Sequence, residues 1–351
     1  MNEGRAHGPA TAFSLRLRAV SSTARLAPGR RGFRARRGRR ARSAGKLGDR
    51  VLFGLCALAG LLVVATLADV IYQLANNATP AINQFGLPFV WHTRWAPNFK
   101  IEGAGALIYG TVVASLIALV LATPLGIAIG LFLSMMAPAR VRAVIGPLVE
   151  MLAAVPSIIY GFWGLVVLVP FIYHLEPGLH SVLGFIPLFG TPSTTGVSLM
   201  TAGIVLTVMI LPIISALSRD LFLTVPRELK DGAAALGATQ WEVIRGIVLP
   251  STASGVGAAV VLGLGRALGE AIAVSFVIGD VTQIHGSVFE PGSTIAAEIA
   301  TQFESPVNNL QTAAMFYAGL ILVVIAMLCS VAARSIAGRF DVSAGMLAKA
   351  G

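Results

Sequence analysis

Six long apolar segments dominate the chain, and shorter polar stretches separate them. A helix needs roughly 20 apolar residues to cross the hydrocarbon core of a bilayer, which is about 30 Å thick. The segments that reach this length run over residues 51–75, 106–136, 143–173, 199–223, 252–279 and 312–334. The second and third are longer than one perpendicular crossing needs, and we expect Pro124 and Pro156 to kink them. The pattern predicts an all-α membrane protein with six transmembrane helices.

The composition agrees with a membrane protein, and the distribution of charge separates a tail over residues 1–50 from the remainder of the chain. The chain is 56% hydrophobic and 12% charged, whereas soluble domains are about 25% charged. Residues 1–50 hold 14 of the 26 lysines and arginines and only two acidic residues. This arginine-rich tail has too few apolar residues to build a core, so we expect it to be disordered. Phe33 is the only aromatic residue among its arginines, so nucleic-acid binding is not expected.

Charge in the loops predicts the orientation, because cytoplasmic loops retain Lys and Arg. If the N-terminus is inside, the inner loops and the C-terminal end collect most of the remaining basic residues, namely Arg140, Arg142, Arg219, Arg227, Lys230, Arg245, Arg334, Arg339 and Lys349. The outer loops then hold only Arg94 and Lys100. We therefore expect a multi-pass plasma-membrane protein with a membrane domain over 51–340, a short tail over 341–351 and both termini in the cytoplasm.

The loop between the fourth and fifth segments, "VPRELKDGAAALGATQWEVIRGIVLP" (225–250), is typical of two short helices. Pro226 suits a first helical turn, and the acidic Glu228 and Asp231 favour the positive N-terminal end of the first helix. One apolar face has i, i+4, i+7 spacing and comprises Leu229, Ala233 and Leu236. Such a stripe has no lipid to cover it, so the loop predicts a partner protein.

The second helix of this loop has its own boundary signals. Gly237 supplies the stop after the first helix. Thr239 and Glu242 form a T-x-x-E capping box at the start of the second. Pro250 is expected to end the second helix before the next membrane segment.

The same loop carries a family resemblance. Its spacing is similar to the EAA loop of importer-type ABC permeases, E-A-A, three residues, G, nine residues, I-x-L-P, matched here by Asp231, Gly232, Ala233, Gly237, Ile247, Leu249 and Pro250. Asp231 replaces the glutamate, and Gly232, in place of the first alanine, lowers helix propensity by up to about 1 kcal/mol. Two further stretches, "EMLAAVPSIIYGFWG" (150–164) and "GLGRALGEAIAVSFVIG" (263–279), resemble the PstC permease family of bacterial phosphate importers.

The resemblance covers most of residues 51–340 and implies a division of labour. It implies the MetI-like fold of type I ABC importer permeases, a PstB-like ATPase dimer docked on the EAA loop, a second PstA-like permease and a PstS-like extracytoplasmic binding protein. ATP and magnesium are then expected on the ATPase, with no cofactor on this chain. The residues agree, since no lysine is followed by Ser or Thr as a P-loop requires. No H-E-x-x-H or Cys/His cluster predicts a metal site or catalysis.

Two charges interrupt the fifth apolar segment. Arg266 lies 14 residues beyond Thr252, roughly 21 Å along a helix, which is near the middle of a bilayer. Such a charge has an insertion cost of about 2.5 to 3.5 kcal/mol. Glu270, at i+4, would share its helical face and pair with it.

The two charges admit a structural interpretation, a tolerated ion pair, and a functional one. A guanidinium is a planar fork of donors that matches an oxyanion, and Glu270 would restrain Arg266 so that the anion is released. Ser157 and Tyr160, just after Pro156, either offer hydroxyls to the same anion or bond back to a kinked helix. The G-x-x-x-G from Gly265 to Gly269 would admit a neighbouring helix.

The leading hypothesis is therefore a permease subunit that carries inorganic phosphate inward. A permease for another oxyanion, such as sulfate or molybdate, fits the same residues. An ion-coupled secondary transporter with Arg266 and Glu270 as a relay is a third possibility, but it leaves the EAA-like loop unexplained.

Overall fold

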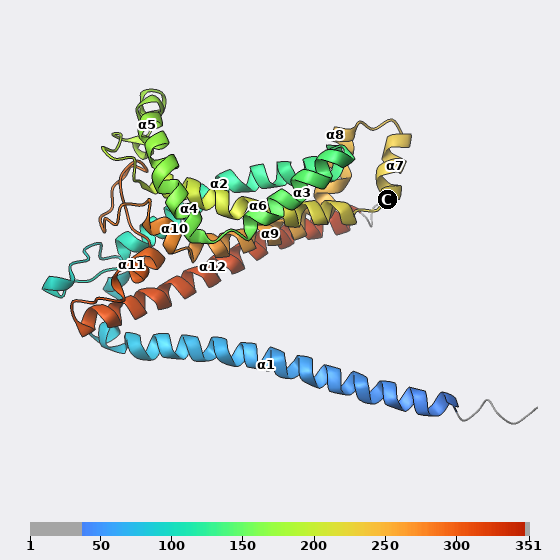
Figure 1. Ribbon diagram of the computed structural model, residues 1–351, viewed down its shortest axis with the longest axis horizontal. Coiled ribbons are helices and arrows are strands. Elements are labelled where there is room, and N and C mark those ends of the chain that lie inside the picture. Colours follow the sequence, from blue (N-terminus) through green and yellow to red (C-terminus); the bar gives the residue numbers. More distant parts are fainter. Residues whose placement is uncertain (1–36, 348–351) are drawn as a thin grey trace, which may run out of the picture. The chain divides into compact units, whose positions relative to one another are not determined.

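The computed structural model describes residues 37–347, with side chains placed from residue 48 to residue 335. This part is mostly helical, and within it the only β pairing is two isolated bridges. Six of its helical stretches are long and apolar enough to cross a membrane (Figure 1): Gly48–Phe85, Gly105–Met136, Ser157–Leu183, Leu199–Thr224, Gln240–Leu268 and Asn309–Ser335. The predicted all-α class with six membrane helices is confirmed.

The chain divides into two compact units, Met1–Ala65 and Thr66–Gly351. In the first unit the described residues form the N-terminal part of α1 (Arg37–Phe85), and the apolar side chains from Val51 onward are exposed. A helix that is apolar on all sides and uncovered within its unit suits lipid contact.

The start of α1 corrects the predicted tail. We expected disorder over residues 1–50, but residues 37–50 are helical, and residues 1–36 lie outside the described part. Arg, Ala and Lys are good helix formers. Extending an existing helix also needs no new nucleus, so the charged segment continues the membrane helix. At the other end, α12 (Asn309–Leu347) likewise runs through most of the predicted tail over 341–351.

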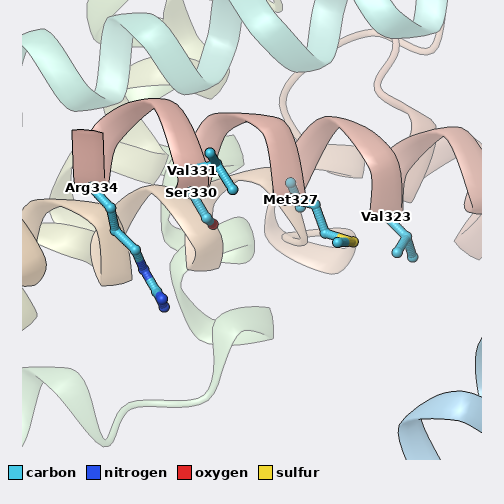
Figure 2. A pocket seen from close by; sticks show the side chains of 6 residues that line it. Val323, Met327, Ser330, Val331 and Arg334 are labelled. Carbon is cyan, nitrogen blue, oxygen red and sulfur yellow. The ribbon is translucent and has the colours of Figure 1, made fainter. Parts of the chain in front are cut away.

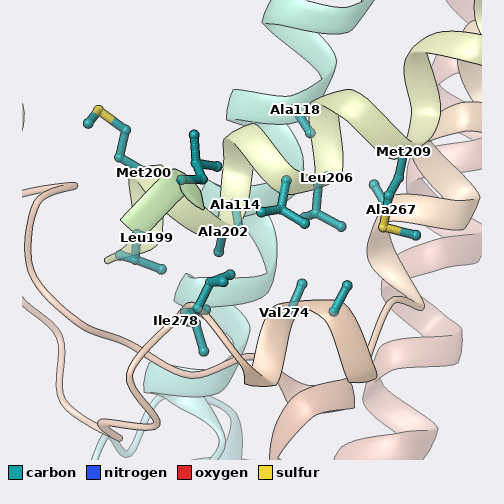
Figure 3. Packing of buried hydrophobic residues seen from close by; sticks show 14 of the residues in the cluster. Ala114, Ala118, Leu199, Met200, Ala202, Leu206, Met209, Ala267, Val274 and Ile278 are labelled. Atoms are coloured by element: carbon teal, nitrogen blue, oxygen red, sulfur yellow. The ribbon is translucent and has the colours of Figure 1, made fainter. Parts of the chain in front are cut away.

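The core of the second unit is α6 (Leu199–Thr224) packed against α2 (Gly105–Leu131). In α6 72% of the most apolar window is buried, against 33% or less in the other five spans, so α6 is the helix that its neighbours surround. Figure 3 shows part of this packing, with Ala114 and Ala118 of α2 in one cluster with Ala202 and Leu206 of α6.

A stripe of small side chains lets α2 and α6 approach closely. Buried residues of α2 repeat at every fourth position with no side chain larger than a methyl group: Gly110, Ala114, Ala118, Ala122, Gly126 and Gly130. A Cβ at Gly126 would lie 2.8 Å from Cγ2 of Ile214, and one at Gly130 would lie 3.0 Å from the amide nitrogen of Arg219. Small residues at this spacing allow two helix backbones to come together, which gives dispersion contact where no hydrophobic driving force acts.

The third membrane helix corrects the predicted range 143–173. The chain forms α3 (Ala139–Ala153), breaks, and restarts as α4 (Ser157–Trp163), which continues to Leu183. Pro156 causes the break rather than a kink, because it lacks an amide hydrogen and forces Val155 out of the helical region. The membrane helix is therefore 157–183, and α3 is a separate helix with Gly146 as its only buried residue. Pro124, in contrast, lies inside an unbroken α2.

Three π turns follow one rule in this fold. They are η3 (Phe132–Met136), η4 (Gly164–Leu168) and η6 (Ile244–Val248). Each ends two residues before a proline: Pro138, Pro170 or Pro250. A π turn bonds i to i+5, and in η4 and η6, after which the helix continues, the wider spiral accommodates the ring and the missing amide hydrogen that would disrupt an α-helix. After η3 the helix ends, and Pro138 precedes α3.

The π turn η6 explains why Pro250 does not end a helix, contrary to our expectation. α8 (Gln240–Val243), η6 and α9 (Leu249–Leu268) form one continuous stretch, with Pro250 in the first turn of α9. The second helix of the 225–250 loop is thus the start of the fifth membrane helix.

The third span ends with α5 (Val169–Leu183). Shorter elements lie between the membrane helices, namely the 3₁₀ turns η1 (Leu87–Val90), η2 (Pro97–Phe99) and η5 (Pro187–Phe189) and the helices α7 (Arg227–Ala235), α10 (Ile272–Ser275) and α11 (Ile295–Gln302).

Adding a side chain to the small-residue stripe should destabilise the fold. We expect Gly126→Val to lower the melting temperature of the detergent-solubilised protein, because the new methyl groups overlap Ile214 and overpacking costs about 1–3 kcal/mol. Gly60→Val in α1, where a Cβ meets nothing within 4 Å, is the matched control. Equal losses in the two variants would contradict close packing of α2 on α6.

Candidate functional site

Arg266 lies in the last turn of α9, on an exposed surface of the second unit. The predicted helix over 252–279 is wrong in its end, because the helix stops at Leu268 and Gly269 follows. Gly265 and Gly269 both weaken the helix here, since glycine is about 1 kcal/mol less favourable than alanine. The guanidinium therefore lies at a helix terminus rather than in the middle of a helix.

Glu270 does not pair with Arg266. The helix ends between them, so the i, i+4 geometry that predicted their pairing is lost, and neither ion pair among the described side chains joins them. Glu270 instead accepts a hydrogen bond from the amide of Ala273 through Oε1, at 3.2 Å, in the first turn of α10. Each charge thus suits the helix end beside it, a cation at a C-terminus and an anion at an N-terminus.

The other two predicted site residues lie at the start of α4, which packs against α10. A Cβ at Gly161 would lie 2.8 Å from the Cα of Ala273, so the two backbones are in close contact. Ser157 is half-buried and Tyr160 is buried. Arg266 is close enough to Tyr160 to act on it electrostatically. The structure therefore gathers Arg266, Glu270 and Tyr160 at the contact of three helices.

The hydroxyl of Tyr160 already has a structural partner. It donates a 2.7 Å hydrogen bond to the carbonyl of Leu152, in the last turn of α3. That carbonyl belongs to a helix end, where backbone acceptors lack intrahelical partners. Of the two roles predicted for Tyr160, bonding back across the break at Pro156 is the one that its geometry supports.

The glycines beside Arg266 leave one side of it uncovered by the described chain. A Cβ at Gly265 would meet nothing within 4 Å, and one at Gly269 would meet only the carbonyl of Gly265, at 3.7 Å. Gly263, in contrast, packs against Ile214 of α6. The helix thus has a packed side and an open side, with Arg266 next to the open glycines.

The 225–250 loop, which resembles an EAA loop, forms the two short helices α7 and α8 with the expected glycine stop and capping box. Gly237 has a φ of 90°, a conformation that favours glycine. Thr239 and Glu242 make both hydrogen bonds of the capping box. The prediction of two short helices with these boundaries is confirmed, apart from the end assigned to Pro250.

The side chains of this loop divide into an outer and an inner set. Leu236 is 92% exposed and Leu229 is 54% exposed, so two members of the predicted stripe remain uncovered, whereas Ala233 packs inward. The inner set packs on Phe222, Val225 and their neighbours and includes Ile247 and Leu249. The remaining predicted coupling residues are exposed: Glu228, Asp231, Gly232, Gly237 and Pro250.

The inner side of the loop also contacts the turn at the C-terminal end of α2, which the sequence did not predict. Gln240 donates a hydrogen bond of 3.1 Å to the carbonyl of Met135 in η3. Lys230 donates to the carbonyl of Phe222 at 3.4 Å, and its Nζ lies 4.0 Å from the sulfur of Met135. Both short helices therefore touch one π turn at the end of the most closely packed helix pair.

An ion pair joins α3 to α6 on the same side. Arg219 lies 2.9 Å from Glu150 and 3.3 Å from Asp220. The guanidinium passes over Gly146 of α3, where a Cβ would lie 3.0 Å from Nη1. A larger residue at 146 would block this path, and the pairing of Arg219 with Glu150 could not be read from the sequence because the two are far apart in the chain.

A hollow on the surface of α12 is not part of this arrangement. Figure 2 shows its lining side chains, which all come from α12: Val323, Ala326, Met327, Ser330, Val331 and Arg334. Its lining is mostly apolar, and Met327 and Val331 are about 60% exposed. Such a surface suits lipid contact along a membrane helix.

The fold and the loop together define a membrane-embedded transport component, and comparison with known proteins agrees. The family model described as "Binding-protein-dependent transport system inner membrane component" matches residues 122–342. The permease-like fold also occurs in the crystal structure of a bacterial alginate ABC transporter in complex with an alginate pentasaccharide-bound periplasmic protein. That chain has a TM-score of 0.55, 16% identity, and coverage of 83% of this chain and 95% of its own.

Curated relatives narrow the family. The phosphate transport system permease protein PstC of Mesorhizobium japonicum is 42% identical over 304 residues, covering 85% of this chain and 93% of the relative. PstC of Haemophilus influenzae is 44% identical, with 77% and 86% covered, and a probable PstC of Methanocaldococcus jannaschii is 35% identical, with 73% and 82% covered. The chain therefore belongs to the PstC family of inner-membrane transport components, as its loop and two internal stretches indicated.

Removing the hydroxyl of Tyr160 should weaken the junction of α3 and α4. We expect Tyr160→Phe to reduce stability by about 1 kcal/mol, the net worth of one hydrogen bond, and to lower the melting temperature of the solubilised protein. Tyr72→Phe, at a tyrosine that is 65% exposed, is the control. A melting temperature unchanged by Tyr160→Phe would rule out a structural role for the bond to Leu152.

Proposed function

We propose that this chain is the transmembrane permease subunit of an ATP-driven importer of inorganic phosphate, and that it forms half of the translocation pathway. Membership of the PstC family carries this proposal. The location of Arg266 beside two open glycines supports it, because a pathway shared with a second permease needs an uncovered helix surface. The chain is then a non-catalytic transport subunit.

Arg266 is the proposed anion contact. A guanidinium offers a planar fork of donors to a tetrahedral oxyanion. It makes no hydrogen bond or ion pair with another described residue, so its donors remain available to an anion. Glu270 does not neutralise it directly but places a negative charge nearby, which favours release after binding. Ser157 and Tyr160 border the same region from α4.

The proposed partners follow the type of transporter. A PstB-like ATPase dimer docks on the exposed side of α7, a PstA-like permease packs against the open face of α9, and a PstS-like binding protein delivers the anion from outside. The exposed Leu229 and Leu236 support the first contact, because large apolar side chains outside the membrane helices favour a protein partner. ATP and magnesium belong to the ATPase, both termini lie in the cytoplasm, and neither nucleic acid nor a cofactor on this chain is part of the proposal.

The contacts of Gln240 and Lys230 with η3 offer a route by which motion of the ATPase reaches α2. When the ATPase displaces α7 and α8, Gln240 and Lys230 pull on the π turn at the end of α2. α2 and α6 are packed too closely to slide past each other, so the displacement moves both as one body. The ion pair between Arg219 and Glu150 adds α3 to that body.

Loss of the guanidinium should abolish efficient transport. In membrane vesicles containing the assembled transporter, we expect Arg266→Gln to reduce phosphate uptake at least about tenfold, because a hydrogen bond to a charged group is worth about 1.5–3 kcal/mol. Arg334→Gln, at an exposed arginine of α12, is the control. Normal uptake by the Arg266 variant would refute the role of Arg266. Stronger competition by sulfate or molybdate than by unlabelled phosphate would instead identify the competing anion as the cargo.

Two variants should distinguish the docking of the ATPase from the transmission of its motion to α2. We expect Leu236→Asp to reduce the ATPase that copurifies with the chain, because it places a charge on the exposed docking surface. Gln240→Ala should retain the ATPase but lower the phosphate transported per ATP hydrolysed, because only the bond to Met135 is lost. An unchanged transport ratio in Gln240→Ala would exclude this route to α2.

A further inference from the structure

The segment that follows Arg266 folds back on itself before α11. Gly279 and Gly292 form an isolated parallel bridge, with hydrogen bonds of 2.9 Å from Gly292 to Ile278 and 3.0 Å from Val281 to Gly292. Asp280 lies between these bonds and has a φ of 52°, which non-glycine residues rarely adopt. The fold of the segment therefore fixes Asp280 in one position.

Three polar side chains meet where this segment reaches α11. Ser293 Oγ lies 2.9 Å from Oε2 of Glu298 and 3.3 Å from Oδ1 of Asp280. Glu298 and Ser293 are each only 1% exposed, whereas Asp280 faces solvent. The other carboxyl oxygen of Glu298 accepts a hydrogen bond from Gln302. The cluster thus joins a buried carboxyl group to an exposed one through a single hydroxyl.

If Glu298 and Asp280 were both ionised, the cluster would have too few donor hydrogens for the two contacts of Ser293. A serine hydroxyl has one hydrogen and can donate to only one acceptor, while an ionised carboxylate can only accept. With both acids ionised, one of the two short contacts would bring two acceptors together in a buried site. Both contacts are attractive if Glu298 carries a proton and donates it to Ser293, while Ser293 donates to Asp280.

We propose that Glu298, Ser293 and Asp280 form a proton-binding site, with the proton held on Glu298, that fastens the segment between α9 and α11 to α11. The relay through Ser293 gives this buried proton a path to solvent at Asp280. Ser293 is also held against α2, since its carbonyl oxygen occupies the space that a Cβ at Gly110 would need. The site therefore joins the outer segment to the closely packed helix pair.

Electrostatics favours the same protonation state. Burial, and then the charge of Asp280, raise the pKa of Glu298 from 4.5 to about 8, against a smaller opposing effect of Ser293. The elements packed on α11 are α2, α10 and α12. α10 contains no titratable residue, and the hydroxyls of Tyr109 in α2 and Tyr317 in α12 donate to the carbonyls of His285 and Gly86. Asp280 is thus the charged group that acts on Glu298.

The bound proton also affects how the segment that follows Arg266 and α9 is held against α6. The segment that it fastens also holds the N-terminus of α6, through hydrogen bonds from Ser198 to Val277, from Leu199 to Glu290 and from Met200 to Val288. Loss of the proton leaves two negative charges joined by one hydroxyl, which loosens the segment that runs on from α9. The outer part of the fold is then weakest at alkaline pH.

Thermal stability across a pH range tests the site without reference to any cargo. A carboxyl whose pKa is raised in the folded state binds more protons folded than unfolded between the two values. Its stabilisation is therefore complete below pH 4.5 and is lost as the pH rises to about 8, by up to tenfold per pH unit in the ratio of folded to unfolded protein. We expect the melting temperature of the solubilised full chain to fall over this range in the wild type and to fall less steeply in Glu298→Gln, whose amide still donates but does not titrate.

A second carboxyl, Glu102, must be separated from this effect. Burial alone raises the pKa of Glu102 to about 7, so Glu102 steepens the wild-type curve but leaves the difference between wild type and Glu298→Gln unchanged. Parallel curves for these two proteins would overturn the proposal. Asp280→Asn, at an exposed residue, is the second variant. It removes the charge that raises the pKa of Glu298, so the fall should end at a lower pH, and an unshifted curve would also contradict the proposal. Failure of phosphate uptake would bear on the proposed function and leave both results standing.

Discussion

The close approach of α2 and α6 is the constraint on which the rest of the second unit depends. Six small residues repeat at intervals of four along α2, and at Gly126 and Gly130 the close approach of α6 leaves no room for a larger side chain. In a membrane, water does not drive helices together, so their attraction comes from dispersion contact over short distances. The other elements use this pair as a base: Ser293 fits over Gly110, Arg219 emerges beside Gly130, and the 225–250 loop bonds to the end of α2.

Three of the polar residues predicted for the site lie at helix ends and breaks, not along helix faces. Arg266 is in the last turn of α9, Glu270 accepts a hydrogen bond from the first turn of α10, and Tyr160 reaches across the break before α4. A helix end offers unpaired backbone groups and a partial charge, so polar side chains there have partners that a helix interior cannot supply. A site built in this way changes whenever two helices change their relative position, as the proposed function requires.

Much of the fold could be predicted from the sequence, and the errors in that prediction share a cause. Hydropathy found six spans, and local signals found the stop at Gly237 and the capping box at Thr239. The kink expected at Pro156 and the helix end assigned to Pro250 were both wrong, because Pro156 breaks its helix whereas Pro250 follows a π turn and lies within a continuous helix. The sequence does not distinguish the two prolines locally. The pairing of Arg266 with Glu270 failed because it assumed an unbroken helix. Gly110, Ala114, Ala118, Ala122, Gly126 and Gly130 were readable as a period of four, whereas the contacts of Gln240 with Met135 and of Glu298 with Ser293 depend on tertiary structure.

The π turns have one further consequence. In an ordinary helix a widened turn can pass from one residue to the next, because every amide can exchange one acceptor for another. A proline two residues downstream has no amide hydrogen to exchange, so η4 and η6 are each fixed to one place in the sequence. The third and the fifth membrane helix therefore each consist of two α-helical segments joined at a π turn whose position is fixed. The joint in the fifth helix lies between α8, which belongs to the 225–250 loop, and the end of α9 that bears Arg266, so any bending between these two ends is centred on a fixed place in the sequence.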